Sequence, residues 1–369
     1  MPQSRRDPRE TMPPPPDHDD SLFDDYVGKG DGTTWKPGSP VHSPFADDDD
    51  VADTIRDQDK EQGRETESFN LPRRVLADEF DAQANDDNFA PAEPVNPEVG
   101  DTTGQYVLQD RLGAGVSCFV FRGWDEQNGC PVALKIINWA NVHDRTAAMK
   151  QMRTEAASLA RVKHPRVVRF IDFGFDPRWP FLVTEFVEGR SMGELIRGSA
   201  LPVEWAVYLV SQVVDGLGAV WRAGLVHRDI KPDNVLVGPN GVAKLIDFGL
   251  AKTFLAPGTA GTSELAGTAA YLAPEQARDA SVVDPRADIY SLGVTFYEAL
   301  TGKLPFDSRN RMQMIFHHIN TPVASPAVHV PELPQIVCDM CLWMLAKNPD
   351  ERPQTYDDLR AAFDTIMGN

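Results

Sequence analysis

Residues 227–234 read His-Arg-Asp-Ile-Lys-Pro-Asp-Asn, and this octet carries the most specific signal in the chain. A helical pattern ends just before it. A strand hairpin follows, in which Val235–Val237 and Val242–Ile246 are the strands and Pro239-Asn240-Gly241 is the turn. Asp247-Phe248-Gly249 stands where the hairpin ends. The pattern predicts that two aspartates, an asparagine and a lysine meet at one edge of this hairpin.

The side chains of this predicted cluster suit metal-assisted phosphoryl transfer. One aspartate and the asparagine would hold Mg²⁺, and the lysine would neutralise the phosphoryl group in transit. The other aspartate would orient the attacking hydroxyl. An octet at full spacing is far more specific than a lone glycine-rich turn, so it outweighs the other motifs.

Toward the N-terminus, apolar residues alternate before and after Gly113-Ala114-Gly115 and predict a strand on each side. A dinucleotide-binding fingerprint would need a helix after the glycines, and none is predicted there. A glycine-rich hairpin can instead lie over the phosphates of a nucleotide, because no side chain keeps its amides away. Taken alone, this signal is weak.

A lysine and a glutamate follow in apolar surroundings. Lys135 lies within the apolar run Val132–Ile137, where its charge needs an anionic partner. Glu155 is the candidate, because Met152 and Leu159 at helical spacing place it on the inward face of a predicted helix. Without the other motifs, two unrelated surface charges would be the more ordinary interpretation.

The order of the predicted elements defines the fold class. Strand patterns continue over Val167–Phe173 and Phe181–Val187. Helical patterns then dominate, over 202–222, 284–301 and 332–346. We expect an α+β architecture of two lobes: an antiparallel sheet with one helix, then a mainly helical lobe after a hinge near 185–190.

The first hundred residues differ from the rest in charge and proline content. They hold 25 acids, 10 bases and 13 of the 30 prolines, including Pro13–Pro16 and Asp47–Asp50. Such a segment cannot bury enough apolar surface to offset chain entropy. We expect a largely disordered, acidic N-terminal extension over residues 1–103. Its apolar islands, among them Leu22–Phe23 and Val75–Leu76, would dock on a partner, fold back on the chain or stay solvated.

Composition excludes several classes of protein. The chain carries 55 acids and 36 bases, a net charge of −19, which disfavours nucleic acid as a partner. No apolar run has the length of a membrane-spanning helix, and no apolar signal segment follows Arg5-Arg6. Four cysteines in 369 residues do not make a disulfide framework. We expect a soluble chain in a reducing, cytoplasmic setting, with no membrane insertion.

The stretch from about 106 to 366 resembles the eukaryotic-type (Hanks-type) protein kinase superfamily, and within it the bacterial Ser/Thr protein kinases. The octet, Asp247-Phe248-Gly249 and Ala273-Pro274-Glu275 carry the resemblance. It implies a bilobal kinase domain over 104–366, with the N-lobe over 104–187 and the C-lobe over 188–366. It also implies transfer of the γ-phosphoryl of ATP to Ser or Thr of protein substrates, with Mg²⁺ as cofactor and Mn²⁺ as an alternative.

The resemblance also assigns site residues. Asp229 matches the catalytic aspartate, and Lys231 the lysine of the γ-phosphate. Lys135 matches the lysine that holds the α and β phosphates, and Glu155 its helix partner. The metal ligands would be Asn234 and Asp247. The other ATP-binding positions would be Leu112, Gly113, Ala114, Gly115, Val120, Ala133, Thr184, Glu185, Val187 and Leu236.

Four positions bear on acceptor specificity and on the framework of the domain. Lys231, two residues after Asp229, and Thr268, before Tyr271, both favour Ser/Thr over Tyr acceptors in this superfamily. By the same resemblance, Asp288 would brace the catalytic loop. Arg352 would pair with Glu275.

The segment from 247 to 275 is predicted to regulate activity. In the superfamily, an arginine placed like Arg228 often receives a phosphate from this segment, since guanidinium binds phosphate through paired hydrogen bonds. We expect autophosphorylation there, with a homodimer as one route for transfer between copies. The alternative is a loop that is always ordered and carries unmodified hydroxyls. The candidate phosphosites are Thr259, Thr262 and Ser263.

One motif position departs from the superfamily pattern. Cys118 stands where the third glycine of the phosphate loop is expected, so either a redox-sensitive thiol or simple tolerance could explain it. Two alternatives to an active kinase stay open: an ATP-binding pseudokinase scaffold and a small-molecule phosphotransferase. The presence of Lys135, Asp229 and Asp247 argues against the first, and Ala273-Pro274-Glu275 against the second.

Overall fold

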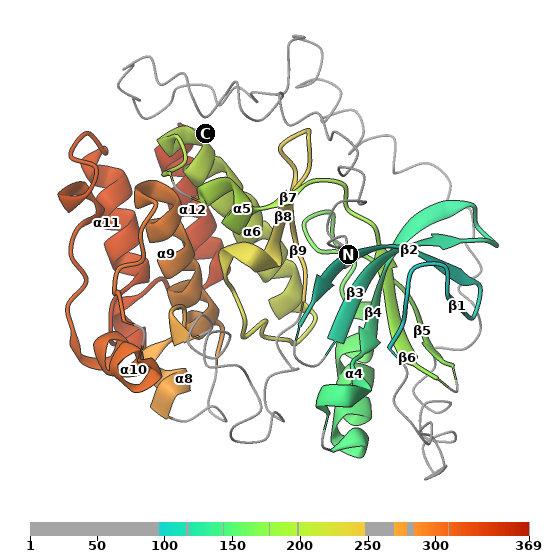
Figure 1. Ribbon diagram of the computed structural model, residues 1–369. Helices are drawn as coiled ribbons and strands as arrows, with labels where there is room; N and C mark the ends of the chain where they lie inside the picture. Colours follow the sequence, from blue (N-terminus) through green and yellow to red (C-terminus); the bar gives the residue numbers. More distant parts are fainter. Residues whose placement is uncertain are drawn as a thin grey trace, which may run out of the picture. The chain divides into compact units, whose positions relative to one another are not determined.

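The computed structural model describes residues 96–115, 118–142, 144–176, 178–197, 199–247, 269–278, 284–308 and 310–368. Within this part, strands and one long helix form an N-lobe, and helices dominate a C-lobe (Figure 1). The α+β, two-lobed expectation is confirmed. The extension expected over 1–103 lies outside the described residues as far as residue 95.

Six antiparallel strands form the sheet of the N-lobe, in the order β1-β2-β3-β4-β6-β5. Side chains alternate across a strand, so Val132, Leu134 and Ile136 of one strand are buried in the lobe while Ala133 and Lys135 face the other way. The strands are β1 (Thr102–Thr103), β2 (Tyr106–Ala114), β3 (Cys118–Asp125), β4 (Cys130–Ile137), β5 (Phe170–Phe175) and β6 (Pro180–Glu185).

Helix α4 (Arg145–Ala160) packs beside the sheet and carries the expected apolar stripe. Met152, Ala156 and Leu159 are buried, and so is Glu155 between them. Asp144 caps the helix by accepting a hydrogen bond from the backbone N–H of Ala147 at 2.8 Å. The prediction of a helix that turns Glu155 inward is therefore confirmed.

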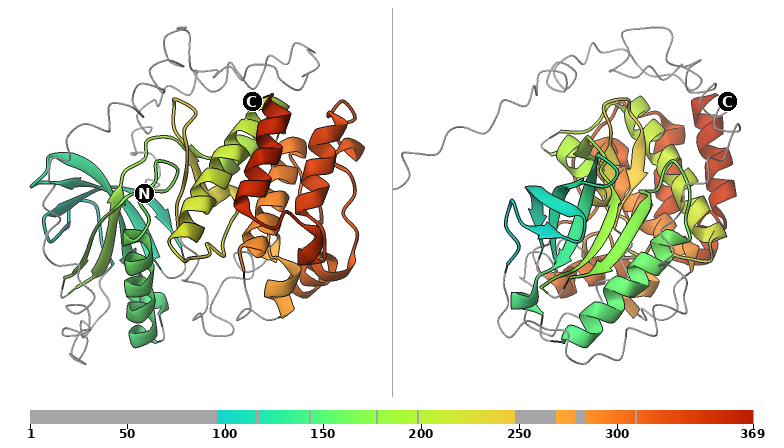
Figure 2. Two further views of the ribbon diagram at one scale, coloured as in Figure 1. Left: turned by 180° about the vertical axis from the view of Figure 1, so that it is seen from behind. Right: turned by 90° about the vertical axis from the view of Figure 1, so that its right-hand side faces the viewer.

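The C-lobe is built around two buried helices. α6 (Val203–Arg222) and α9 (Pro285–Thr301) pack against each other, with α12 (Tyr356–Met367) on α6 and α11 (Gln335–Met344) on α9 (Figure 2). The other elements are β7 (Arg190–Ser191), α5 (Met192–Ile196), β8 (Val235–Val237), β9 (Ala243–Leu245), α8 (Pro274–Arg278) and α10 (Arg311–Asn320). Short 3₁₀ turns are η2 (Trp139–Asn141), η3 (Pro232–Asn234), η5 (Pro326–Val328) and η6 (Pro349–Glu351).

Strand β5 begins later than the sequence pattern predicts. The apolar run starts at Val167, but the strand starts at Phe170. Val167 instead forms a parallel bridge with Leu245, and the N–H of Val168 donates to the Leu245 carbonyl at 2.9 Å. The start of this run therefore pairs with β9 of the C-lobe and links the two lobes.

Among the described residues, α6 alone is long and apolar enough to cross a membrane, but 72% of its apolar window is buried inside the fold. Packing against α9 and α12 accounts for its apolar composition. Cys338 and Cys341, on α11, are free thiols buried in the core of the C-lobe.

Candidate active site

An aspartate from α9 braces the loop that carries the octet. Asp288 is 1% exposed and accepts hydrogen bonds from the backbone N–H groups of His227 and Arg228, both at 2.8 Å. Arg228 has φ of 68°, a left-handed backbone conformation that a β-carbon disfavours. The Tyr356 hydroxyl from α12 also donates to Asp288, at 3.3 Å. Burial raises the pKa of Asp288, and these donors oppose the shift.

The predicted catalytic cluster is assembled within this loop. The side-chain amide of Asn234 donates to the carbonyl of Asp229 at 2.7 Å and to its carboxylate at 2.8 Å. Lys231 Nζ lies 3.5 Å from the same carboxylate. Both Asp229 and Asn234 are buried, so their orientation is fixed by packing as well as by hydrogen bonds.

Asp247 joins the cluster from the far end of the β8–β9 hairpin. The backbone N–H of Ile246 donates to the Asn234 carbonyl at 3.0 Å, which holds the two segments together. Asp247 has φ of 52°, also left-handed. Lys135, chiefly, and also Lys231 lower its pKa, so this carboxylate is ionised.

The donor set suits a hard divalent cation. The amide nitrogen of Asn234 is engaged by Asp229, which leaves its amide oxygen as the remaining polar atom. That oxygen and the Asp247 carboxylate are the ligand types that Mg²⁺ prefers. The predicted metal ligands lie on two segments joined by a backbone hydrogen bond, and their ligand atoms are of the type that such an ion prefers.

Lys135 connects the N-lobe to Asp247. Its ammonium lies 2.8 Å from Glu155 Oε1 on α4 and 2.9 Å from Asp247 Oδ1. Burial alone would lower the pKa of Lys135, but the two carboxylates prevail and hold it well above its usual value. The expected Lys135–Glu155 pair is formed, and the contact with Asp247 adds a partner that the sequence pattern did not predict.

Four predicted ATP-binding residues share one face of the sheet. Lys135 lies directly opposite Val120 of β3, and Ala133 directly opposite Thr184 of β6. Because directly opposed residues project to the same side, these side chains line the face that carries Lys135. A flat nucleobase beneath that face would meet Val120 and Ala133.

The glycine hairpin joins β2 and β3. The N–H of Gly115 donates to the Cys118 carbonyl at 2.8 Å and closes the turn, while Val116 and Ser117 lie outside the described residues. A β-carbon added at Gly113 would meet no atom within 4 Å. Leu112 is 52% exposed, and Ala114 is exposed. The hairpin thus presents open space beside the Lys135 face.

A hinge contact was missed by sequence reasoning. The carboxylate of Glu185 accepts from Lys244 Nζ at 2.6 Å and from the backbone N–H of Arg169 at 2.9 Å. Lys244 lies between the buried Ala243 and Leu245, so the alternation of β9 was the available signal. The ion pair ties β9 of the C-lobe to the end of β6, next to the half-buried Val187. Leu236 lies directly opposite Lys244 in the β8–β9 pair.

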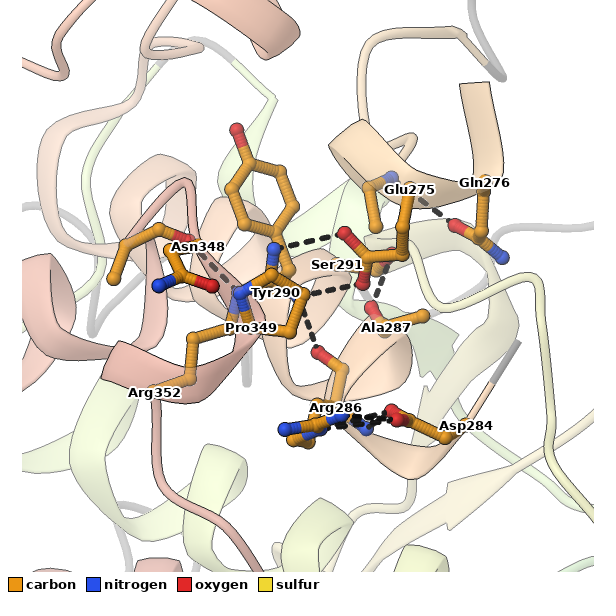
Figure 3. A network of polar contacts seen from close by, with 12 residues as sticks. Glu275, Gln276, Asp284, Arg286, Ala287, Tyr290, Ser291, Asn348, Pro349 and Arg352 are labelled. Atoms are coloured by element: carbon orange, nitrogen blue, oxygen red, sulfur yellow. Dashed lines mark hydrogen bonds and ion pairs between the residues drawn. The ribbon is translucent and has the colours of Figure 1, made fainter. Parts of the chain in front are cut away.

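The expected Arg352–Glu275 pair lies in a dense polar network (Figure 3). The Arg352 guanidinium donates to both oxygens of Glu275, at 2.7 and 2.9 Å, and its side chain is fully buried. It also donates to the carbonyls of Arg286, Ala346 and Lys347. One side chain therefore fixes α8, the start of α9 and the segment that follows α11 together.

The predicted regulatory positions are only partly described. Arg228 is exposed beside the catalytic cluster, where a phosphate could reach it. Thr259, Thr262, Ser263 and Thr268 lie outside the described residues.

Comparison with known proteins identifies the family of this chain. The protein kinase domain family matches residues 106–363, and the chain belongs to that family. The serine/threonine-protein kinase PknL of Mycobacterium tuberculosis is 37% identical over 249 residues, covering 67% of this chain and 62% of the relative. The probable serine/threonine-protein kinase pknA2 of Bifidobacterium longum is 34% identical, covering 68% of this chain and 33% of the relative.

A solved structure supports the fold. The PknI kinase domain of Mycobacterium tuberculosis superposes with a TM-score of 0.58 at 23% identity, covering 74% of this chain and 100% of that domain. The chain spans less than two thirds of the length of both relatives named above. The family as a whole uses ATP and a divalent metal ion, which suits the Lys135 face and the Asn234–Asp247 ligand pair.

Proposed function

We propose that this chain is an active Ser/Thr protein kinase that transfers the γ-phosphoryl group of ATP to hydroxyls of protein substrates. The observation that carries the proposal is the joined cluster. Lys135, held by Glu155, meets Asp247, while Asn234 orients Asp229. The pseudokinase alternative has no such support, since the three residues most often lost from pseudokinases are present and in contact range of their partners.

Each side chain has a task in the proposed reaction. Asp229 accepts the proton of the acceptor hydroxyl and aligns its oxygen, because the Asn234 amide holds the carboxylate in one orientation. Lys231 and Lys135 stabilise the negative charge of the phosphates. Asn234 and Asp247 would hold the divalent cation, proposed as Mg²⁺ with Mn²⁺ as a substitute. That cation would neutralise charge on the β and γ phosphates when bound.

The domain division and setting are also proposals. We assign the kinase domain to 104–366 and an acidic extension to 1–103, with the lobes meeting near 187. All four cysteines are free thiols, which supports a reducing, cytoplasmic location. Phosphorylation at Thr259, Thr262 or Ser263 is proposed to occur between two copies of the chain.

Phosphate incorporation from Mg-ATP tests the proposal. We expect labelling of Ser or Thr in the wild type, and a loss of about 10²- to 10⁴-fold in Asp229→Asn. Asp307→Asn, the same change at an exposed position, is the control and keeps wild-type labelling. A rate that rises with protein concentration indicates transfer between copies. No labelling in the wild type with Mg²⁺ or Mn²⁺ overturns the proposal.

A further inference from the structure

A basic stretch interrupts this acidic chain. Residues 144–169 hold seven Lys or Arg and only two acids, although the whole chain has a net charge of −19. The stretch covers α4 and the loop that leads to β5. A concentration of one charge sign on an oppositely charged protein marks a surface that attracts anionic groups.

Three of these bases lie close to Arg222, a fourth base at the end of α6. The Arg161 guanidinium at the end of α4 donates to the carbonyl of Ala223, the residue that follows Arg222 at the end of α6. Arg166 packs against α6, since a β-carbon added at Gly216 would lie 3.3 Å from its Cβ, and both Arg166 and Arg222 act electrostatically on His164. Lys163 lies between Arg161 and His164 in the chain and is exposed. We call Arg161, Lys163, Arg166 and Arg222 the α4–α6 basic surface.

Two properties make this surface available for binding. None of its four side chains forms an ion pair with a described carboxylate within 4.0 Å, and Asp215, which acts on Arg166 from a longer distance, is paired with Arg360 at 3.4 Å. Trp221, next to Arg222, is 48% exposed. An exposed aromatic ring beside cations that have no ion-pair partner among the described residues suits a ligand that is both acidic and apolar.

The chain itself contains such a ligand outside the described residues. Residues 75–87 hold five acids, no base, and the apolar Val75, Leu76 and Phe80. We propose that residues 75–87 bind the α4–α6 basic surface of the same molecule. The acids face the four cations, and an apolar side chain covers Trp221. The run Asp47–Asp50 has charge but lacks this close alternation with apolar residues, so it is the weaker candidate.

The length of the connecting chain permits this contact. Asp78 is 18 residues from the first described residue, Asn96. A flexible chain of that length spans about 23 Å on average and about 60 Å when extended. A domain of the described size has a radius of gyration of about 18 Å, so its surfaces lie within reach. A tethered segment binds at high effective concentration, which favours it over a separate partner.

Zero-length cross-linking with a carbodiimide, applied to the full chain at low salt, tests the proposal. This reagent joins a carboxylate to a lysine amine only when the two are in contact. We expect mass spectrometry to find Lys163 joined to Asp78, Glu79 or Asp81, and the exposed Lys303 unjoined to them. Raising the salt from about 10 mM to about 1 M shortens the Debye length from about 30 Å to about 3 Å and should cut the yield about tenfold.

A charge-reversal pair sharpens the test and leaves both cross-linking groups intact. Arg166→Glu with Arg222→Glu should reduce the Lys163 cross-link about tenfold, whereas Lys303→Glu with Arg311→Glu, the same charge change elsewhere, should leave it unchanged. The salt series on the wild type still decides the matter if the first double variant does not fold. The readout needs no ATP, so it is independent of the proposed kinase activity.

Three outcomes would overturn the proposal. The first is a wild-type chain with no cross-link at Lys163. The second is a cross-link that goes to Asp47–Asp50 instead of residues 75–87. The third appears when isotopically labelled and unlabelled chains are mixed: cross-links between the two would assign the surface to the extension of a second copy.

Discussion

Lys135 lies between two carboxylates in different surroundings. The Glu155 side chain is 4% exposed and belongs to the packed interior, whereas the Asp247 side chain is 44% exposed. Glu155 therefore acts as the fixed counter-ion that orients the lysine. Asp247 keeps an open side toward which a cation could bind.

Replacing this lysine should change how stability depends on pH. Burial raises the pKa of Glu155, and Lys135 opposes that shift. In Lys135→Met the pKa of Glu155 rises further, so the folded protein prefers the protonated Glu155 carboxyl. The free energy of unfolding of this variant therefore falls as pH increases. The slope should reach up to about 1.4 kcal/mol per pH unit. Urea unfolding at pH 5 and pH 8, with exposed Lys150→Met as control, measures it. Equal pH dependence in both variants would contradict this.

Substituting two glycines of the N-lobe by alanine should have opposite effects: one should change ATP binding and leave stability intact, and the other should lower stability. Gly113→Ala adds a methyl group in open space, so the melting temperature should stay within about 2 °C while the KM for ATP rises. Gly174→Ala would place its β-carbon 2.2 Å from the Phe181 ring and should destabilise the fold by about 1–3 kcal/mol. Calorimetry and ATP titration of both variants check the pair. An unchanged KM in Gly113→Ala would remove the hairpin from the ATP site.

The Lys135–Glu155 pair could be predicted because both residues lie in regular elements with clear periodicity. The contact between Lys135 and Asp247 could not, since the residues are 112 positions apart and no local pattern connects them. The Glu185–Lys244 pair was missed for the same reason. Local spacing identifies which face a side chain takes, but the partner across the lobes depends on the tertiary fold.

At the scale of elements, the Arg352 side chain donates hydrogen bonds to several backbone carbonyls at once. The carbonyls at the start of α9 and just after α11 accept hydrogen bonds from its guanidinium, and Glu275 of α8 balances its charge. Removing the charge partner of a fully buried cation is more costly than removing an exposed one, because water cannot replace the lost interaction.

Two acids of this network allow that difference to be measured. Glu275→Ala should lower the free energy of unfolding by about 3–5 kcal/mol, since it strands the buried Arg352. Asp350→Ala removes one partner of Arg286, at 2.7 Å, but that aspartate is 79% exposed and Asp284 still pairs with Arg286, so the loss should stay below about 1 kcal/mol. Urea denaturation of both variants gives the two values. Equal losses would show that the burial of Arg352 contributes little.

Element boundaries could be predicted where capping residues mark them. Helix α9 starts after Asp284, which accepts from the Arg286 N–H at 2.9 Å, and ends at Gly302 with φ of 65°. The predicted span 284–301 therefore matches the structure to one residue. The span predicted over 332–346 was too long, because α11 begins only after Pro334, which ends the preceding turn.

For the whole molecule, the buried side chain of His318 makes the stability of the fold depend on pH. His318 is fully buried, and its Nδ1 lies 3.0 Å from the Tyr290 hydroxyl, which also accepts a hydrogen bond from Lys347. Burial, with Lys347 nearby, lowers the pKa of His318 to about 4. The fold therefore favours the neutral ring.

Acid should destabilise the protein through this residue. The folded-state pKa lies below the unfolded value of about 6.5, so stability is lost as pH falls from about 6.5 toward 4, by about 3 kcal/mol. In His318→Gln that part of the loss disappears, although the variant is less stable at pH 7. Melting temperatures between pH 7 and pH 4.5 compare the two, with the exposed Lys303→Gln as control. Parallel curves would contradict the assignment.

The brace at Asp288 has a consequence for how the molecule comes into being. The ribosome delivers His227 and Arg228 some 60 residues before Asp288, and Tyr356 arrives later still. A growing chain therefore holds every side chain of the catalytic cluster well before the carboxylate that keeps Arg228 in its left-handed conformation. The cluster can reach its final geometry only when α9, and then α12, have been synthesised and folded. Under the proposed kinase function, an unfinished chain therefore lacks the brace that orders its catalytic loop.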